Sequence, residues 1–250
     1  MQRPIKILVL LFDCVEVLDF AGPYDVFSMA NLAVEGGKPP ACGQHGLAYD
    51  LSTVSRDGGT VTALHGLRVQ ADYSFETCPV GEFDVVVVPG SGPDVVRAFV
   101  GDRATEAQRD VVDWVAKRCA DTRIVASVCV GALFLAKVGA LEGRQATTHH
   151  GALADLARLA PGAEVLAGAR YVHNALDPDA PADEGRHLLL SAGVSAGIDL
   201  ALYMLRALLG GDSVADATAQ IMEFNPTSNG ARRIPMRTAS ARVQPDRKVG

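Results

Sequence analysis

The fold of this chain is constrained most by one segment. In it, an apolar strand-forming run passes directly into a cysteine and then into a helix-forming stretch. Residues 123–136 read RIVASVCVGALFLA, with the β-branched part first and helix formers after Gly131. The first part is typical of a buried parallel strand and the second of a helix. Cys129 therefore lies at a strand-to-helix turn, at the sheet edge where α/β proteins place their sites.

The residues alone leave two interpretations of Cys129 open. Most free cysteines are buried, small and inert. At the start of a helix, however, the helix dipole favours a thiolate, and we expect the sharp turn to expose the sulfur. We favour the second interpretation, a nucleophile elbow.

Strand and helix patterns alternate along the chain. Strands are expected at 5–12, 48–54, 83–90, 124–128, 171–174 and 187–191, with a weaker hairpin at 61–71. Helices are expected at 22–32, from Thr105 onward, from the elbow to about 139, and at 153–159, 195–209 and 213–223. Thr105 and Gln108 predict a capping box, and Cys119 lies on the apolar face of that helix. The alternation predicts an α/β fold with a mostly parallel sheet covered on both faces.

Composition favours one domain without a nucleic-acid or membrane partner. The chain has 250 residues, 48% of them hydrophobic, and a formal charge of −6. We expect an α/β domain over 1–226 and a basic, flexible tail over 227–250, with dimer contacts or anion binding as the minor alternative for the tail. Neither a secretory leader nor an apolar run of membrane-spanning length is apparent. Five scattered cysteines, an odd number, fit a reducing compartment, so we expect a cytoplasmic protein.

A thiolate nucleophile needs donors for the charge that develops on its substrate. The backbone N–H of Val130 opens the elbow helix. The turn Gly90-Ser91-Gly92 follows a neighbouring strand, and its small residues allow main-chain amides to approach a ligand. A plain strand-to-loop turn is the alternative interpretation of the same glycines.

The nucleophile also needs a group that accepts or supplies protons, and the end of the first strand offers Asp13, Glu16 and Asp19. Asp19 stands between Leu18 and Phe20, just before the expected helix, so it should be the least solvated. A carboxyl group in an apolar pocket has a raised pKa and can carry a proton. On the residues alone, this role and simple capping of the next helix are equally supported.

His149 and His150 follow the elbow helix, and His149 is a candidate substrate-binding residue. Adjacent side chains on an extended segment point to opposite faces, so at most one should face the site. The remaining histidines are dispersed and no motif has metal-ligand spacing, so no metal is expected. Without a phosphate-binding glycine motif, no nucleotide cofactor is expected either.

Five segments together resemble the ThiJ/PfpI superfamily, relatives of class I glutamine amidotransferases with a flavodoxin-like three-layer sandwich. They read LDFAGPYDVF at 18–27, VPGSG at 88–92, SVCVGA at 127–132, ATTH at 146–149 and SAGVSAGID at 191–199. They are most similar to the isonitrile hydratases and to the amidase-like domain of AraC-type regulators. The resemblance implies a cofactor-free homodimer in which Cys129 attacks an isonitrile carbon and Asp19 handles protons.

Two departures from the family pattern bear on the reaction. Val130 stands where isonitrile hydratases often have Thr and where PfpI-type peptidases have His, and Ser91 replaces the second glycine of the PGG turn. Other interpretations are a ligand-sensing module, a glyoxalase or deglycase type of stress protein, and a specialised biosynthetic enzyme. The tail is too short for the helix-turn-helix region of AraC-type regulators, and the stress proteins generally carry Glu at the position of Asp19.

Overall fold

The computed structural model describes residues 3–34, 41, 44, 46–177, 179–181 and 184–226. The main sheet has seven strands in the order β10-β11-β7-β6-β1-β2-β5. Only β10 and β11 pair in antiparallel fashion, and the other neighbours in this sheet are parallel. The strands are β1 (Ile5–Leu10), β2 (Tyr49–Ser55), β5 (Tyr73–Ser74), β6 (Val85–Val88), β7 (Ile124–Ser127), β10 (Tyr171–Ala175) and β11 (His187–Ser191).

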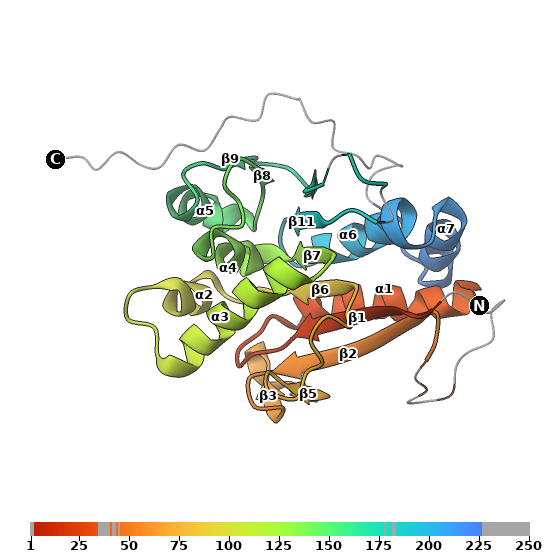
Figure 1. The fold of residues 1–250 in the computed structure, drawn as a ribbon, viewed down its shortest axis with the longest axis horizontal. Coiled ribbons are helices and arrows are strands. Elements are labelled where there is room, and N and C mark those ends of the chain that lie inside the picture. The colour runs from red at the N-terminus through yellow and green to blue at the C-terminus, as the bar shows by residue number, and fades with distance from the viewer. Residues whose placement is uncertain are drawn as a thin grey trace.

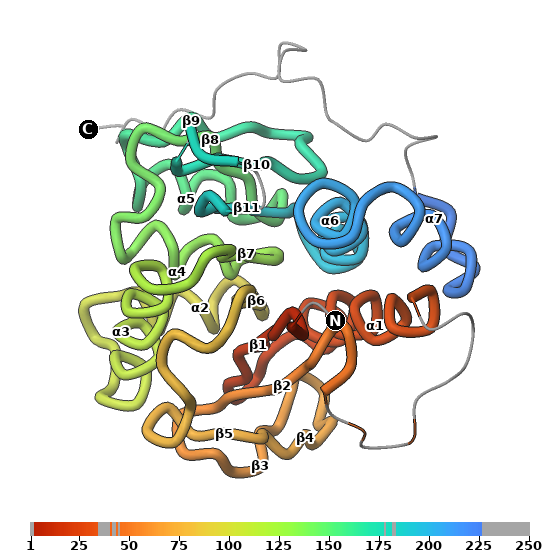
Figure 2. Tube along the Cα trace, turned by 45° about the vertical axis from the view of Figure 1, so that its right-hand side comes forward, coloured from red at the N-terminus to blue at the C-terminus, as the bar shows by residue number. Residues whose placement is uncertain are grey.

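Helices cover both faces of the sheet and give three layers (Figures 1 and 2). One layer contains α1 (Val17–Val34), α6 (Ala196–Met204) with its π-helical extension η4 (Leu205–Leu209), and α7 (Asp212–Ile221). The other contains α2 (Pro93–Val100), α3 (Glu106–Asp121) and α4 (Ala132–Lys137), with α5 (Leu153–Leu159) packed on α4. The expected α/β sandwich with a mostly parallel sheet is confirmed.

The central strands are apolar throughout because both of their faces are covered. All residues of β6 and β7 are buried, as are residues 7–10 of β1. The capping box at the start of α3 is also present. The Thr105 hydroxyl accepts from the Gln108 amide at 3.3 Å, and the Gln108 side chain accepts from the Thr105 amide at 2.8 Å.

Short elements complete the fold. The expected hairpin consists of β3 (Thr60–Thr62) and β4 (Arg68–Gln70), separated by the 3₁₀ turn η1 (Leu64–Gly66). The strands β8 (Gln145–Ala146) and β9 (Glu164–Val165) pair in parallel. Two further 3₁₀ turns, η2 (Cys129–Gly131) and η3 (His150–Ala152), precede α4 and α5.

Three expectations differ from the structure. The first helix begins at Val17, not at residue 22, because Phe20 already belongs to its buried face. The helix α2 was not expected at all. Cys119, which the four-residue spacing predicts as a core residue, is half-buried and packs at the margin of the core. Residues 35–40, after α1, and the basic tail expected over 227–250 lie outside the described residues.

Candidate active site

Cys129 occupies the sharp turn between β7 and η2. Its φ of 59° lies in the left-handed region, which a non-glycine residue keeps only when its surroundings impose it. Two contacts do so here: the Cys129 amide donates to the carbonyl of Ala192 at 3.1 Å, and its carbonyl accepts from the Thr148 hydroxyl at 2.8 Å. This geometry is that of a nucleophile elbow.

The turn after β6 packs directly on the elbow, which requires glycine on both sides. A Cβ atom on Gly90 would lie 2.7 Å from the Val130 nitrogen, and a Cβ atom on Gly131 would lie 2.2 Å from the Val88 carbonyl oxygen. Any larger residue at either position would force the two segments apart. Gly90 and Gly131 therefore allow the turn after β6 and the elbow after β7 to pack directly against each other.

Asp19 lies beside Cys129 although the two residues come from different layers of the fold. Its side chain is fully buried in the first turn of α1, and Oδ2 accepts a hydrogen bond from the Gly90 amide at 3.0 Å. The Cys129 side chain and the Val194 amide lie near this carboxyl group, but its Oδ1 has no hydrogen-bond partner among the described residues. Burial raises the pKa of Asp19 to about 7, and the negative charge of Glu16 acts in the same direction. A purely capping role is disfavoured because Asp19 lies inside the helix and binds the amide of another segment.

The sulfur of Cys129 is not exposed, contrary to the expectation from the turn. The residue is 3% exposed. Burial, together with the negative charge of Asp19, raises the pKa of the Cys129 thiol to about 12, although the amides of Val130 and Val194 act to lower it. The helix dipole favours the thiolate, but the hydration that the sulfur loses on burial has the larger effect on its pKa. Cys129 and Asp19 instead form a buried pair in which each group affects the ionisation of the other.

The other first-strand carboxyl groups and the rest of the turn after β6 have different surroundings. Asp13 is exposed and accepts from the Thr62 amide at 2.9 Å, next to the hairpin. The Ser91 hydroxyl donates to the carbonyl of Cys14, and Gly92 precedes the first residue of α2. Within this turn, Gly90 is therefore the residue whose amide binds Asp19.

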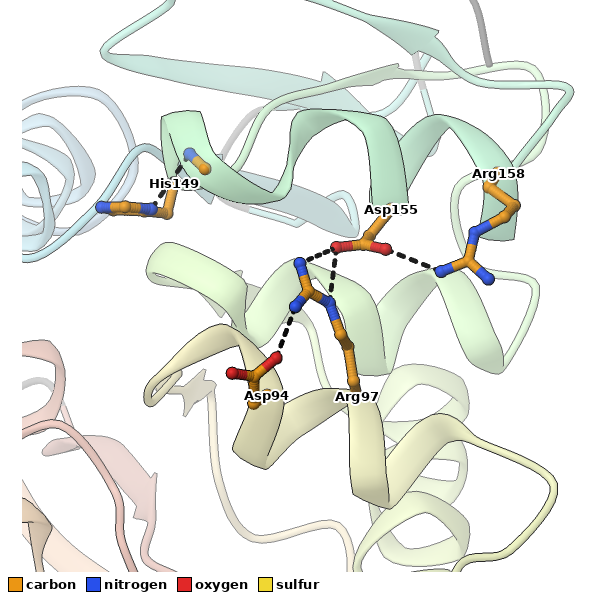
Figure 3. Close-up of polar contacts among 6 residues, drawn as sticks. Asp94, Arg97, His149, Asp155 and Arg158 are labelled. Atoms are coloured by element: carbon orange, nitrogen blue, oxygen red, sulfur yellow. Dashed lines mark hydrogen bonds and ion pairs between the residues drawn. The ribbon is translucent and has the colours of Figure 1, made fainter. Parts of the chain in front are cut away.

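His149 precedes η3 and is half-buried against the loop after β11. Its Nδ1 accepts a hydrogen bond from the Gly151 amide at 3.1 Å (Figure 3). A Cβ atom on Gly193 would lie 2.3 Å from the His149 Cδ2, so the ring rests on that glycine. Burial and the neighbouring His150 lower the pKa of His149. The expectation that the two histidines point apart is wrong: their ring centroids are 4.1 Å apart because the chain turns into η3 at His150.

Ion pairs join the helix that follows the Gly90 turn to the helix that follows His149. Arg97 of α2 binds Asp155 of α5 through its Nε at 2.8 Å and also binds Asp94 (Figure 3). Asp155 in turn accepts from Arg158 at 2.6 Å. These contacts connect α2 with α5, which lie in the same helical layer of the fold as α4.

Val194 is a site residue that the sequence patterns did not identify. It lies in the turn between β11 and α6 with φ at 51°, close to both Cys129 and Asp19. A β-branched residue disfavours this conformation, so no local propensity indicates it. Val194 is part of the motif at 191–199, one of the five segments that resemble the superfamily. That motif was the only signal in the sequence that could have identified it.

Among the described residues, no set of three or more His, Cys, Asp or Glu side chains is arranged to hold a metal ion. Within the same part of the chain, no helix combines the length and the apolar character that crossing a membrane requires.

The fold and this site define a class of α/β protein in which a cysteine at a strand-to-helix elbow lies against a buried carboxyl group. The sequence matches the DJ-1/PfpI family over residues 5–207. The chain belongs to this family, which confirms the superfamily that the five motifs indicated.

Three known proteins show how the chain relates to others. It is 32% identical over 224 residues to an isonitrile hydratase from Pseudomonas putida, covering 88% of this chain and 77% of that protein. The crystal structure of a ThiJ/PfpI family protein from Pseudomonas syringae aligns with a TM-score of 0.68 at 25% identity, covering 89% of this chain and 76% of the other. An AraC family transcriptional regulator from Pseudomonas putida shares the fold, with a TM-score of 0.64 at 22% identity over 88% of this chain and all of the other.

Proposed function

We propose that this protein is a cysteine-dependent lyase of the isonitrile hydratase type, which adds water to an isonitrile and releases an N-substituted formamide. The observation that carries the proposal is the buried contact between Asp19 and Cys129. The similarity to an isonitrile hydratase over most of the chain supports the reaction class.

The first half of the reaction follows from the ionisation of this pair. With a pKa of about 7 for Asp19 and about 12 for Cys129, the carboxylate takes the thiol proton as the sulfur attacks. The sulfur forms a bond to the terminal isonitrile carbon, and Asp19 transfers the proton to that carbon. The product is a thioimidate, R–N=CH–S–Cys129, with Asp19 again ionised.

The second half consumes one water molecule and restores the enzyme. Asp19 takes a proton from the water as the oxygen bonds to the thioimidate carbon, and the proton passes to the nitrogen. The carbon–sulfur bond then breaks, the hydroxyl proton returns to the sulfur, and R–NH–CHO leaves. No oxidation or reduction takes place, so the residues of the site supply all the required proton transfers.

The burial of Cys129 also fits this substrate class. An isonitrile group is linear and ends in a single carbon atom. It can therefore reach the sulfur through a narrower opening than the planar carbonyl group of a peptide requires. Val130 follows the cysteine where a histidine dyad partner would stand in PfpI-type peptidases, so a peptidase reaction has less support.

The proposal is tested by offering the purified protein an aliphatic isonitrile, methylglyoxal and a peptide. We expect formamide from the isonitrile, with Cys129→Ala and Asp19→Asn each losing at least about 100-fold in kcat/KM. Cys14→Ala removes an exposed cysteine outside the pair and serves as the matched control. Isonitrile turnover that persists in Cys129→Ala would exclude the mechanism, and binding without turnover would favour a sensor. The homodimer that the resemblance implies stays a prediction, to be checked by light scattering.

A further inference from the structure

Ser91 carries a buried hydroxyl group in a turn where the ThiJ/PfpI pattern has a second glycine. The residue is 5% exposed, and its hydroxyl donates to the carbonyl of Cys14 in the connection between β1 and α1, residues 11–16. Ser91 also forms an isolated antiparallel bridge with Val15 of the same connection. A serine hydroxyl has one hydrogen to donate, and here the chain itself accepts it. The structure therefore gives Ser91 a hydrogen bond that a glycine at this position could not make.

The connection between β1 and α1 is held from two sides. On one side lies the hairpin: the Cys14 amide donates to the Thr62 carbonyl at 2.8 Å, and the Leu64 amide donates to the Val15 carbonyl at 2.8 Å. On the other side lies Ser91. Cys14 has a φ of 65°, in the left-handed region, which a non-glycine residue keeps only when its surroundings impose it. The contact to its amide from the hairpin and the contact to its carbonyl from Ser91 hold it in this conformation.

The peptide groups of Gly90 bind the same connection and the start of α1. The Gly90 carbonyl accepts from the Glu16 amide at 3.0 Å, and the Gly90 amide donates to Oδ2 of Asp19 at 3.0 Å. Oδ1 of Asp19 has no hydrogen-bond partner in the described part of the chain, so the orientation of the carboxyl group depends on this donor. Ser91 follows Gly90 directly. Its hydroxyl bond and the bond between Glu16 and Gly90 therefore hold the turn against the connection, next to the bond that reaches Asp19.

We propose that Ser91 is a positioning residue: its hydroxyl holds the connection between β1 and α1 against the turn after β6, which keeps the Gly90 N–H directed at Asp19. This role requires no contact between Ser91 and the substrate. The inference rests on the proposed function, because Asp19 carries the protons of that reaction. A donor held firmly at Oδ2 favours the ionised carboxyl group, so Ser91 acts on the chemistry through Gly90 and Asp19.

The test removes the hydroxyl and leaves the backbone of the turn in place. Ser91→Ala deletes only this group, and Ser91→Gly restores the double-glycine turn, so one variant remains usable if the other fails to fold. Ser91→Thr keeps a hydroxyl and is the rescue variant. Ser55→Ala is the matched control, because Ser55 is 2% exposed and its hydroxyl accepts from the Gly58 amide at 3.1 Å, in a different turn.

Two NMR readouts report on the donor directly. The first is the pKa of Asp19, about 7 in the parent protein and followed on the carboxyl carbon. We expect this pKa to rise by about 0.5–1 pH unit in Ser91→Ala and Ser91→Gly, because a loosened donor favours the carboxylate less. The second is the pH-dependent shift of the Gly90 amide proton, which should become about twofold smaller, because hydrogen bonds weaken steeply as they lengthen or bend. Ser91→Thr should stay close to the parent protein, and Ser55→Ala should change neither readout.

An unchanged Asp19 pKa in Ser91→Ala or Ser91→Gly would overturn the proposal. An equal rise in Ser55→Ala would do the same, because it would show a general effect of losing a buried hydroxyl. Kinetics with an aliphatic isonitrile separate positioning from substrate contact. The midpoint in the pH dependence of kcat/KM should rise together with the Asp19 pKa, whereas a raised KM at an unshifted midpoint would mean that Ser91 contacts the substrate and that the positioning role is wrong.

The NMR readouts use no isonitrile, so the two proposals fail separately. Shifted readouts in a protein that turns over no isonitrile would leave the role of Ser91 standing and remove the lyase. Isonitrile turnover with unshifted readouts would remove the role of Ser91 and leave the lyase.

Discussion

The Gly90 amide donates a 3.0 Å hydrogen bond to Oδ2 of Asp19. This bond joins the turn after β6 to the first turn of α1. Because Gly90 also packs against Val130, the same turn positions the carboxyl group and supports the elbow. The contact between Asp19 and Cys129 therefore depends on three separate segments, and changes in any of them should affect the ionisation of the pair.

The rate of isonitrile hydration should depend on the ionisation of Asp19. The proposed mechanism starts from an ionised carboxyl group and a neutral thiol, so kcat/KM should rise with pH through a midpoint near 7 and then level off, because the thiol has a pKa of about 12. The measurement is kcat/KM between about pH 5 and pH 9. A decrease in kcat/KM through the same midpoint would mean that the protonated carboxyl group is the starting form.

Replacing Asp19 should stabilise the protein at alkaline pH while it removes activity. The folded-state pKa is raised from the usual 3.8 to about 7, so the folded protein binds the proton more tightly than the unfolded chain. Stability is therefore lost as pH rises from about 4 to 7, by up to about 4 kcal/mol at about 1.4 kcal/mol per pKa unit. Asp19→Asn should gain stability relative to the parent protein at pH 8 but much less at pH 4, measured by urea unfolding. An equal gain at both pH values would show that charge burial is not the cause.

The close packing of Gly90 should make it intolerant of any side chain. Gly90→Ala places a Cβ atom 2.7 Å from the Val130 nitrogen and should cost about 1–3 kcal/mol of unfolding free energy. Gly92→Ala is the matched control two residues away, where the nearest atom would be 3.9 Å from the new Cβ and φ is −58°. The control should change stability by less than about 0.5 kcal/mol. Equal losses in the two variants by thermal unfolding would contradict the packing argument.

The ion pair between α2 and α5 should contribute little to the free energy of unfolding. We expect this contribution only above acid pH. Burial acts to raise the pKa of Asp155, but hydrogen bonds from Arg97 and Arg158 outweigh it and lower the pKa. The stabilisation is present above the usual pKa of 3.8 and is lost as pH falls through the lower folded-state value. A double-mutant cycle of Arg97→Ala and Asp155→Asn should give a coupling of about 0.5–1 kcal/mol at pH 7 that weakens with salt. A coupling that is unchanged at a pH where Asp155 is protonated in the folded protein would indicate packing as its source.

Local sequence patterns predicted the elements that depend on neighbouring residues. The buried strands follow from apolar runs such as 85–88, and the start of α3 from the pairing of Thr105 with Gln108. The placement of Cys129 between β7 and η2 also follows from a change of residue type within a few positions. In these segments the interactions that decide the structure lie within one strand or one helical turn.

Only the tertiary structure decided the surroundings of the sulfur. The burial of Cys129, the position of Asp19 inside α1 and the left-handed backbone of Val194 all result from contacts between segments far apart along the chain. The close approach of the His149 and His150 rings depends likewise on how the chain turns into η3. The sequence by itself determined which residues could do chemistry and at which strand ends they stand. Their ionisation was decided by folding, because a pKa depends on lost hydration and on the charges and amides that other segments bring close.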